Sequence, residues 1–575
     1  MVNLITDQID IWTSAQIQRT NGAGRGNHSA NNSLHGIKKL RELILELAVR
    51  GKLVPQEPKD EPASVLLEKI AKEKARLIKE GKIKKEKPLP AISDEEKPFA
   101  LPKGWEWARL PDISAYKPGK TPSTKNPIYW SNDSTGIPWV SISDMKHFGL
   151  ITDTDKRITQ AAVDQIFKYD VTPAGSLLMS FKLTVGKISI LDIDAYHNEA
   201  IISIQPFMGL SRDYLFKFLP KRALAGNTKS AIMGNTLNAD SIALLLIPVP
   251  PLAEQHRIVA KVDELMDLCD QLEQQQSYCD AAHQRLVEVM LATLTSATNQ
   301  DEFVDAWHRI ANHFDVLFTT EQSVDQLKQI ILQLAVMGKL VSQEPKDEPA
   351  SVLLEKIAKE KARLIKEGKV KKQDRLLKIT DDEKPFEIPH GWVWVRFGEV
   401  VNFKSDLVNP NDYLDWDQIA PDSIEKGTGK LLFRRTVAES GVKGPNNKFC
   451  TGQILYSKIR PSLSKAIVAA FDGLCSADMY PLDPMIDSQF LLKDILSNTF
   501  LVQVRIAENR VKMPKLNIQS LSNIIIPIPP LAEQNRIVAK VDELMAVCDT
   551  FAERIKDAQT TQVQLADAIV EQAII

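Results

Sequence analysis

The chain has 575 residues, of which 43% are hydrophobic and 25% are charged, and its formal net charge is −2. This length excludes a single core and predicts three or four units, and no stretch approaches the ~18 apolar residues of a membrane span. Residues 1–7 lack a secretory signal, so we expect a cytoplasmic protein. The five scattered cysteines argue against a disulfide framework and against a structural zinc site, so no bound metal is expected.

The first predicted element along the chain is a helical segment that occurs twice. Residues 56–82 return without change at residues 343–369, and we call this segment the first frame repeat. Its apolar residues have helical spacing, and many lysines lie between them. The interleaved Glu68, Glu73 and Glu80 favour a solvated helix face with charge pairs one turn apart over a DNA-binding surface.

The next segment, residues 104–248, is called the first insert and is predicted to be a compact mixed α/β domain. Short apolar runs at 176–181, 187–191 and 200–204 are typical of strands, whereas residues 213–218 are more helical. The insert has 15 Lys and Arg against 13 Asp and Glu.

Basic residues of the first insert gather in two acid-free stretches. Lys117, Lys120 and Lys125 lie in one loop, and Lys182 and Lys187 lie in the run 171–191. Lysines placed in this way supply affinity for DNA phosphates through counterion release, and neighbouring Ser, Thr and Asn side chains can contact base edges.

Long helices are predicted to follow each insert. Residues 250–266 return at 529–545 with one difference, and we call this segment the second frame repeat. Apolar residues after it alternate in steps of four and three, the pattern of a coiled-coil seam. The expected seam residues are Ile258, Val262, Leu265, Cys269, Leu272, Leu286 and Met290 in the first helix, and Ile537, Val541, Leu544, Cys548, Phe551, Ile555, Leu565 and Ile569 in the second. If the second helix returns along the first, the two pack antiparallel around a pseudo-twofold axis.

The second insert, residues 391–527, shares little sequence with the first beyond its ends. It has 16 Lys and Arg against 14 Asp and Glu, and residues 426–465 contain nine basic residues and a single acid, Glu439. Equal frame repeats would present equal surfaces to two copies of one partner, while unlike inserts would recognise two different targets. The alternative, a recent duplication without functional meaning, predicts uniform drift, which the unequal divergence does not show.

Catalytic motifs of a DNA methyltransferase are missing from the sequence. Neither an Asn/Asp-Pro-Pro-Tyr/Phe loop nor a Gly-rich cofactor loop occurs, and residues 409–413 come nearest but read as a turn. We therefore expect a protein that is not an enzyme and that needs no cofactor of its own.

The chain resembles the specificity subunits of type I restriction-modification enzymes over nearly its whole length. The motifs that carry the resemblance are the two frame repeats, Gly119-Lys120-Thr121-Pro122, Ile137-Pro138-Trp139, the segment 180–187 and the segment 456–461. The resemblance implies an α+β fold: two mixed α/β target-recognition domains joined by long helices that form an antiparallel coiled coil, in a pseudo-twofold internal repeat. The predicted parts are 1–103 (helical, first frame repeat), 104–248 (first domain), 249–298 (central helix), 299–390 (linker and repeat), 391–527 (second domain) and 528–575 (C-terminal helix).

The resemblance also implies a function. Each domain reads half of a bipartite, asymmetric DNA site, and two modification subunits, joined by restriction subunits, supply S-adenosylmethionine-dependent adenine methylation and ATP- and Mg-dependent cleavage. Helix length then acts as a ruler for the gap between the half-sites. The residues expected to contact DNA are Lys117, Lys120, Thr121, Ser123, Lys125, Ser141, Lys182, Lys187, Arg434, Arg435, Lys448, Ser457, Lys458, Arg460, Lys465, Lys512 and Lys515. The alternatives are a self-sufficient restriction or modification enzyme and a coiled-coil scaffold unrelated to DNA.

Overall fold

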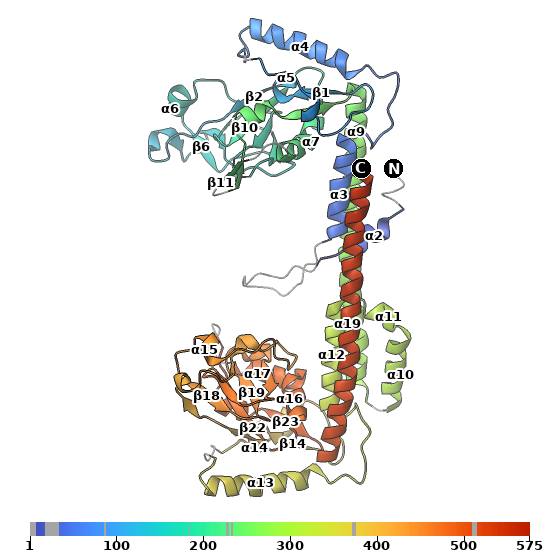
Figure 1. The fold of residues 1–575 in the computed structure, drawn as a ribbon, viewed down its shortest axis with the longest axis vertical. Coiled ribbons are helices and arrows are strands. Elements are labelled where there is room, and N and C mark those ends of the chain that lie inside the picture. The colour runs from blue at the N-terminus through green and yellow to red at the C-terminus, as the bar shows by residue number, and fades with distance from the viewer. Residues whose placement is uncertain are drawn as a thin grey trace. The chain divides into compact units, whose positions relative to one another are not determined.

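Two compact units make up the computed structural model, which describes residues 7–17, 34–85, 88–182, 184–225, 229–231, 234–237, 239–298, 300–370, 375–508 and 514–574. The first unit consists of Met1–Tyr278 with Gln559–Ile575, and the second of Cys279–Ala558. Each unit therefore holds one insert and parts of both long helices. The predicted fold class, mixed α/β domains combined with long helices, is confirmed (Figure 1).

The first insert is built on two larger sheets and a short ladder. The ladder pairs β1 (Glu106–Arg109) with β13 (Leu246–Val249) and so joins the two ends of the insert. A five-stranded sheet has the order β2 (Ser114–Pro118), β10 (Ile201–Pro206), β7 (Leu177–Ser180), β8 (Ile188–Leu191), β5 (Gly149–Ile151). A four-stranded sheet has the order β3 (Trp130–Ser131), β6 (Lys156–Ile158), β4 (Ile137–Val140), β9 (Tyr196–His197), and β11 (Lys229–Ala231) pairs with β12 (Gly234–Thr236).

The helices of the first unit lie mostly outside these sheets. They are α2 (Ile9–Ser14), α3 (His35–Val49), α4 (Ala63–Lys79), α5 (Leu110–Ile113), α6 (Gln160–Ala162), α7 (Arg212–Ala225) and α8 (Ala239–Ala243). The strands expected at 176–181, 187–191 and 200–204 correspond to β7, β8 and β10, and the helix expected at 213–218 lies within α7. Alternate residues of β7, β8 and β10 belong to two different cores, one shared with α7, and burial of both faces of these strands explains why the runs are almost continuously apolar.

The second insert repeats the ladder and, without the edge strand β5, the strand order of the first insert's larger sheet, but its other sheet is ordered differently. Strand β14 (Val393–Arg396) pairs with β23 (Ile525–Ile528), as β1 does with β13. One four-stranded sheet has the order β15 (Val401–Phe403), β22 (Met479–Pro484), β19 (Ile454–Ser457), β20 (Ala466–Val468). The other has the order β16 (Leu407–Val408), β18 (Asn446–Phe449), β21 (Gly473–Ser476), β17 (Gln418–Ile419). The helices of this unit are α10 (Gln300–Asn312), α11 (Phe314–Leu317), α12 (Glu321–Val336), α13 (Ala350–Lys366), α14 (Phe397–Val400), α15 (Val437–Ser440), α16 (Ser488–Leu496), α17 (Asn498–Ala507) and α18 (Ile518–Ser522).

The two predicted long helices are α9 (Leu252–Ser296) and α19 (Leu531–Ile574). In the first unit, Ile258 and Val262 near the start of α9 share a core with Ala566 near the end of α19. In the second unit, Leu291 near the end of α9 shares a core with Ile537 near the start of α19. Since the beginning of each helix shares a core with the end of the other, the helices run antiparallel.

The predicted seam is wrong at one position in the second half of each long helix, whereas Met290, Ile555 and Ile569 pack against a core as predicted. Leu286 is 46% exposed while its neighbour Val287 is buried, and Leu565 is 44% exposed while Ala566 is buried. Val287 follows Cys269 by eighteen residues, which is five turns of a straight helix at 3.6 residues per turn. Five strict 3.5-residue periods fall half a residue short of this distance, and the predicted pattern places the seam at Leu286, so the buried face lies one position later.

The second frame repeat holds each insert against its long helix. Trp105 Nε1 donates a hydrogen bond to Glu254 Oε2 at 3.0 Å, and Gln56 Nε2 donates to Glu254 Oε1 at 2.8 Å. In the second unit, Trp392 and Gln343 donate to Glu533 at 3.0 and 3.1 Å. We call these two triplets the anchors. Burial raises the pKa of Glu254 and of Glu533, although the donors act in the opposite direction.

Further residues of the second frame repeat make matching contacts in both units. The backbone N–H groups of Ser211 and Asp487 donate to Gln255 and Gln534, respectively, at 2.8 and 3.1 Å. The ion pair Arg257–Asp60 corresponds to Arg536–Asp347, and Lys217–Asp263 corresponds to Lys493–Asp542. The same polar residues thus dock two inserts of different sequence, which accounts for much of the identity of this repeat.

Candidate nucleic-acid interface

The loop that follows β2 is fixed in place by hydrogen bonds to its backbone. Gly119 N donates to Ile201 O at 3.1 Å, Lys120 N donates to His197 O at 2.9 Å, and Trp139 Nε1 donates to Lys120 O at 3.0 Å. A Cβ atom on Gly119 would lie 1.9 Å from His197 O, so only glycine allows this close approach. The loop therefore holds the residues after Gly119 in a defined position.

Lys117 at the end of β2 and Lys120 of this loop lie near one aromatic ring. Lys117 Nζ lies 3.1 Å from the ring centroid of Tyr169, and Lys120 Nζ lies 5.5 Å from it. Burial lowers the pKa of Lys117, and the nearby ammonium group of Lys120 acts in the same direction. Lys120 Nζ also donates to Ile166 O at 2.7 Å. The ring and the carbonyl hold two ammonium groups close together, as a phosphate site requires.

The rest of the loop presents polar side chains to solvent. Thr121, Ser123 and Lys125 are all exposed. Trp130 Nε1 donates to Ser123 O at 3.1 Å, and Lys156 Nζ lies 5.6 Å from the Trp130 ring centroid. This loop therefore combines exposed hydroxyl groups with lysines and an aromatic ring, which suits contacts to both phosphates and bases.

The other residues predicted in the first insert make internal contacts elsewhere. Ser141 Oγ donates to the Asp144 carboxylate, and Lys187 Nζ donates to Ile142 O at 3.0 Å. Both interactions meet at the segment that follows β4. Lys182 is half-buried, with its ammonium group 5.4 Å from the ring centroid of Phe181.

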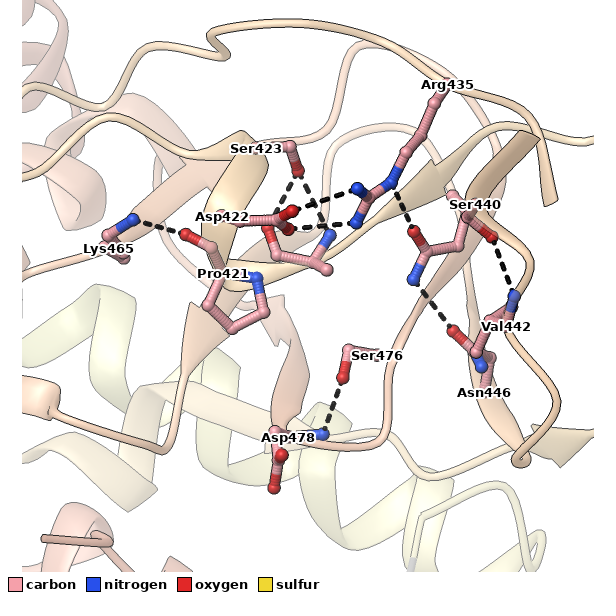
Figure 2. Close-up of polar contacts among 12 residues, drawn as sticks. Pro421, Asp422, Ser423, Arg435, Ser440, Val442, Asn446, Lys465, Ser476 and Asp478 are labelled. Atoms are coloured by element: carbon pink, nitrogen blue, oxygen red, sulfur yellow. Dashed lines mark hydrogen bonds and ion pairs between the residues drawn. The ribbon is translucent and has the colours of Figure 1, made fainter. Parts of the chain in front are cut away.

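The arginine pair of the second insert is partly neutralised by acids that precede the basic run. Arg435 forms two hydrogen bonds of 2.9 Å to Asp422, and Arg434 pairs with Asp417. Arg435 Nε also donates to Gln418, whose amide donates to Asn446 at 3.3 Å (Figure 2). Arg434 stacks at 4.0 Å on the Phe471 ring, and the Asp417 carboxylate raises its pKa. These two side chains are held rigidly, but less positive charge is free than the sequence suggests.

Two further lysines of the second insert lie over aromatic rings. Lys448 Nζ is 5.0 Å from the ring centroid of Trp416, and Lys458 Nζ is 5.5 Å from that of Tyr480. Arg460 is exposed and has a φ of 46°, in the left-handed region. Within the described parts of the chain, neither Lys458 nor Arg460 forms an ion pair.

Several predicted residues of this insert are engaged internally. Ser457 is 1% exposed and its hydroxyl donates to Ile459 O, while Lys465 Nζ donates to Pro421 O (Figure 2 shows the second contact). Lys515 is exposed and pairs with Asp478 at 3.3 Å. Lys512 lies outside the described residues.

The aromatic partners of the lysines were missed by sequence reasoning. Tyr169 lies far along the chain from Lys117, and Trp416 lies more than thirty residues before Lys448. Only the fold brings these pairs together, so no local spacing signals them.

Among the described residues, no helix is long and apolar enough to cross a membrane. No group of three or more His, Cys, Asp or Glu side chains in this part of the chain could hold a metal ion.

Comparisons with known proteins found one matching family model and several similar proteins. A family model described as "Type I restriction modification DNA specificity domain" matches residues 102–278 and 389–558. The Type I restriction enzyme EcoAI specificity subunit of Escherichia coli is 40% identical, over 99% of this chain and 99% of its own length. The EcoEI specificity subunit of the same organism is 38% identical over the same shares. The solved HsdS subunit from Thermoanaerobacter tengcongensis is 18% identical and covers 83% of this chain and 98% of its own, with a TM-score of 0.40.

Proposed function

Because the chain belongs to the family of type I restriction-modification specificity subunits, we propose that it reads a two-part, asymmetric DNA site. The two inserts are its target-recognition domains, and in this proposal each contacts one half of the site. Two modification subunits dock on the chain and restriction subunits join through them. Methylation with S-adenosylmethionine and ATP- and Mg-dependent cleavage then take place in those partner subunits.

The observation that carries the proposal is the contrast between the anchors and the inserts. Glu254 and Glu533 accept the same pair of hydrogen bonds in both units. The sheets of the two inserts differ in strand order: β5 extends the larger sheet of the first insert alone, and the orders β3-β6-β4-β9 and β16-β18-β21-β17 place the strands differently. The two inserts differ but are attached to the long helices by the same contacts. This arrangement suits a protein that presents two different DNA-recognition surfaces in equivalent positions.

The basic side chains next to aromatic rings support DNA as the ligand. Lys117 and Lys120 around Tyr169, and Lys458 beside Tyr480, place ammonium groups where the ring also restricts their motion. Contacts to phosphates would fix the position of each domain, while nearby polar groups would contact base edges.

Selection of bound duplexes from a random pool, using the complex with its modification subunits, tests the bipartite site. We expect two unlike conserved motifs separated by a gap of fixed length. In a variant with four residues inserted after Ser296, where α9 ends, we expect an altered gap and unchanged motifs. One continuous motif, or altered motifs with an unaltered gap, would contradict the proposal.

Removing positive charge from the second insert tests its interaction with phosphates. The double variant Lys458→Ala with Arg460→Ala is expected to weaken duplex binding for all sequences. The slope of log K against log salt is expected to fall by about 0.9 for each phosphate that the variant no longer neutralises. Lys404→Ala is the matched control, because Lys404 lies in the same insert and faces Asp483 at 3.8 Å. Equal salt slopes for the double variant and the wild type would rule out these two phosphate interactions.

A further inference from the structure

The helices α4 and α13 have identical sequences even at positions that face solvent. All seventeen residues agree, from Ala63 to Lys79 and from Ala350 to Lys366. The neighbouring helices α3 and α12 behave differently. They keep buried positions such as Leu40 and Leu327, but the exposed Lys38 is replaced by Asp325. Equivalent exposed positions therefore differ between α3 and α12 but are identical in α4 and α13.

Folding accounts for the identity of only the inner face of these helices. Ala63, Leu66 and Ile70 of α4 are buried, and Lys74 Nζ donates to Pro111 O at 2.7 Å. In α13, Ala350 and Ile357 are buried and Lys361 Nζ donates to Val401 O at 3.1 Å. These contacts fix one side of each helix.

The outer faces have no such internal role. We define the outer face by the exposed residues Glu68, Ala71, Lys72, Ala75, Arg76 and Lys79 of α4 and Glu355, Ala358, Lys359, Ala362, Arg363 and Lys366 of α13. Arg76 pairs with Glu73 and Arg363 with Glu360, within the same helix. Among the residues that the structure describes, neither Lys72 nor Lys359 forms a hydrogen bond or an ion pair with another element. Figure 1 shows both helices at the margin of their units.

An exposed apolar surface adjoins the outer face of α4. A groove of about 430 Å³ is lined by Leu66, Lys72 and Arg76 together with Met208 and Leu252. Met208 is 76% exposed and Leu252 is 37% exposed. Leu531, the residue of the second unit that corresponds to Leu252, is 48% exposed. The long helix of each unit thus exposes the same leucine at its start.

We propose that the outer faces of α4 and α13, with Leu252 and Leu531, are two equivalent docking surfaces that each bind one modification subunit. The proposal rests on the proposed function and names the surface that it leaves open. Two copies of one partner require two equal surfaces, whereas reading two unlike half-sites does not. A protein fits better than DNA, because the glutamates next to Arg76 and Arg363 neutralise them and exposed leucines do not serve phosphate binding.

Counting the bound modification subunits by native mass spectrometry tests this proposal. Lys72→Glu with Ala75→Tyr alters the outer face of α4, and Lys359→Glu with Ala362→Tyr alters that of α13. We expect two modification subunits on the wild-type chain, one on either double variant and none on the combined variant. Lys38→Glu on α3, an exposed position where the copies differ, is the control and should keep two. Unchanged circular dichroism and melting would show that the variants fold.

The possible results separate the two proposals. Retention of two modification subunits by both double variants would overturn the docking surfaces and leave the proposed function intact. Retention of both subunits with weaker duplex binding would assign the outer faces to DNA instead. A wild-type chain that binds no modification subunit would overturn the proposed function, and the docking surfaces with it.

Discussion

Replacing Trp392 with alanine is expected to destabilise the second unit by about 3–5 kcal/mol, the usual cost of truncating a buried aromatic side chain. Trp392 is 6% exposed and belongs to a core that includes Ile537 of α19. Its indole N–H also donates to Glu533, so the variant leaves a buried carboxylate short of one donor. Hydrogen exchange of β14 and β23, with thermal unfolding, measures the destabilisation.

Two companion variants separate the parts of this effect. Trp392→Phe keeps much of the apolar volume and removes only the N–H donor, so a smaller destabilisation of about 1–3 kcal/mol is expected. Trp105→Ala is the matched variant of the first anchor, and it should increase exchange in β1 and β13 rather than in β14 and β23. If Trp392→Ala left the exchange of β14 and β23 unchanged, the anchor would not hold the second insert.

The helical parts of the fold are predictable because the same helical spacing of apolar residues occurs in both copies of each repeat. Ile258 and Val262 are buried as the seam pattern predicts, and so are their equivalents Ile537 and Val541. The pattern failed at Leu286 because a small mismatch between 3.5 and 3.6 residues per turn accumulates over five turns. The anchors were not predicted, since the partners of Glu254 lie some 150 to 200 residues away in the chain.

The candidate site was less predictable than the helices, because the number of basic side chains left unpaired depends on contacts that the sequence does not show. The run 426–465 contains a single acid, yet Arg434 and Arg435 are paired with Asp417 and Asp422, which precede it. The motif Gly119-Lys120-Thr121-Pro122 was singled out from the sequence. The requirement for glycine at position 119 comes from the close approach of the His197 carbonyl, which only the packing of β9 against the loop after β2 reveals.

A buried carboxylate in the described part of the second unit has no hydrogen-bond partner. Asp494 of α16 is fully buried, and neither of its carboxylate oxygens has a hydrogen-bond partner among the described residues. The matching contacts of Lys217 and Lys493 place Phe218 of α7 at the corresponding position of the first unit, where it is 1% exposed in an apolar core. An acid therefore occupies a site that suits an apolar residue.

Replacing Asp494 with asparagine or leucine is expected to stabilise the second unit at neutral pH, by about 1–3 kcal/mol for leucine. Burial raises the pKa of Asp494 well above its ordinary value. As the pH rises through the ordinary value near 3.9, the unfolded chain releases the proton first, so the wild type loses stability until the pH passes the raised folded pKa. Both variants lack this decrease, so their advantage in chemical unfolding should be larger at pH 8 than at pH 4. Asp415→Asn, at an exposed acid of the same insert, is the control, and an equal advantage at both pH values would show that the buried carboxylate carries no such penalty.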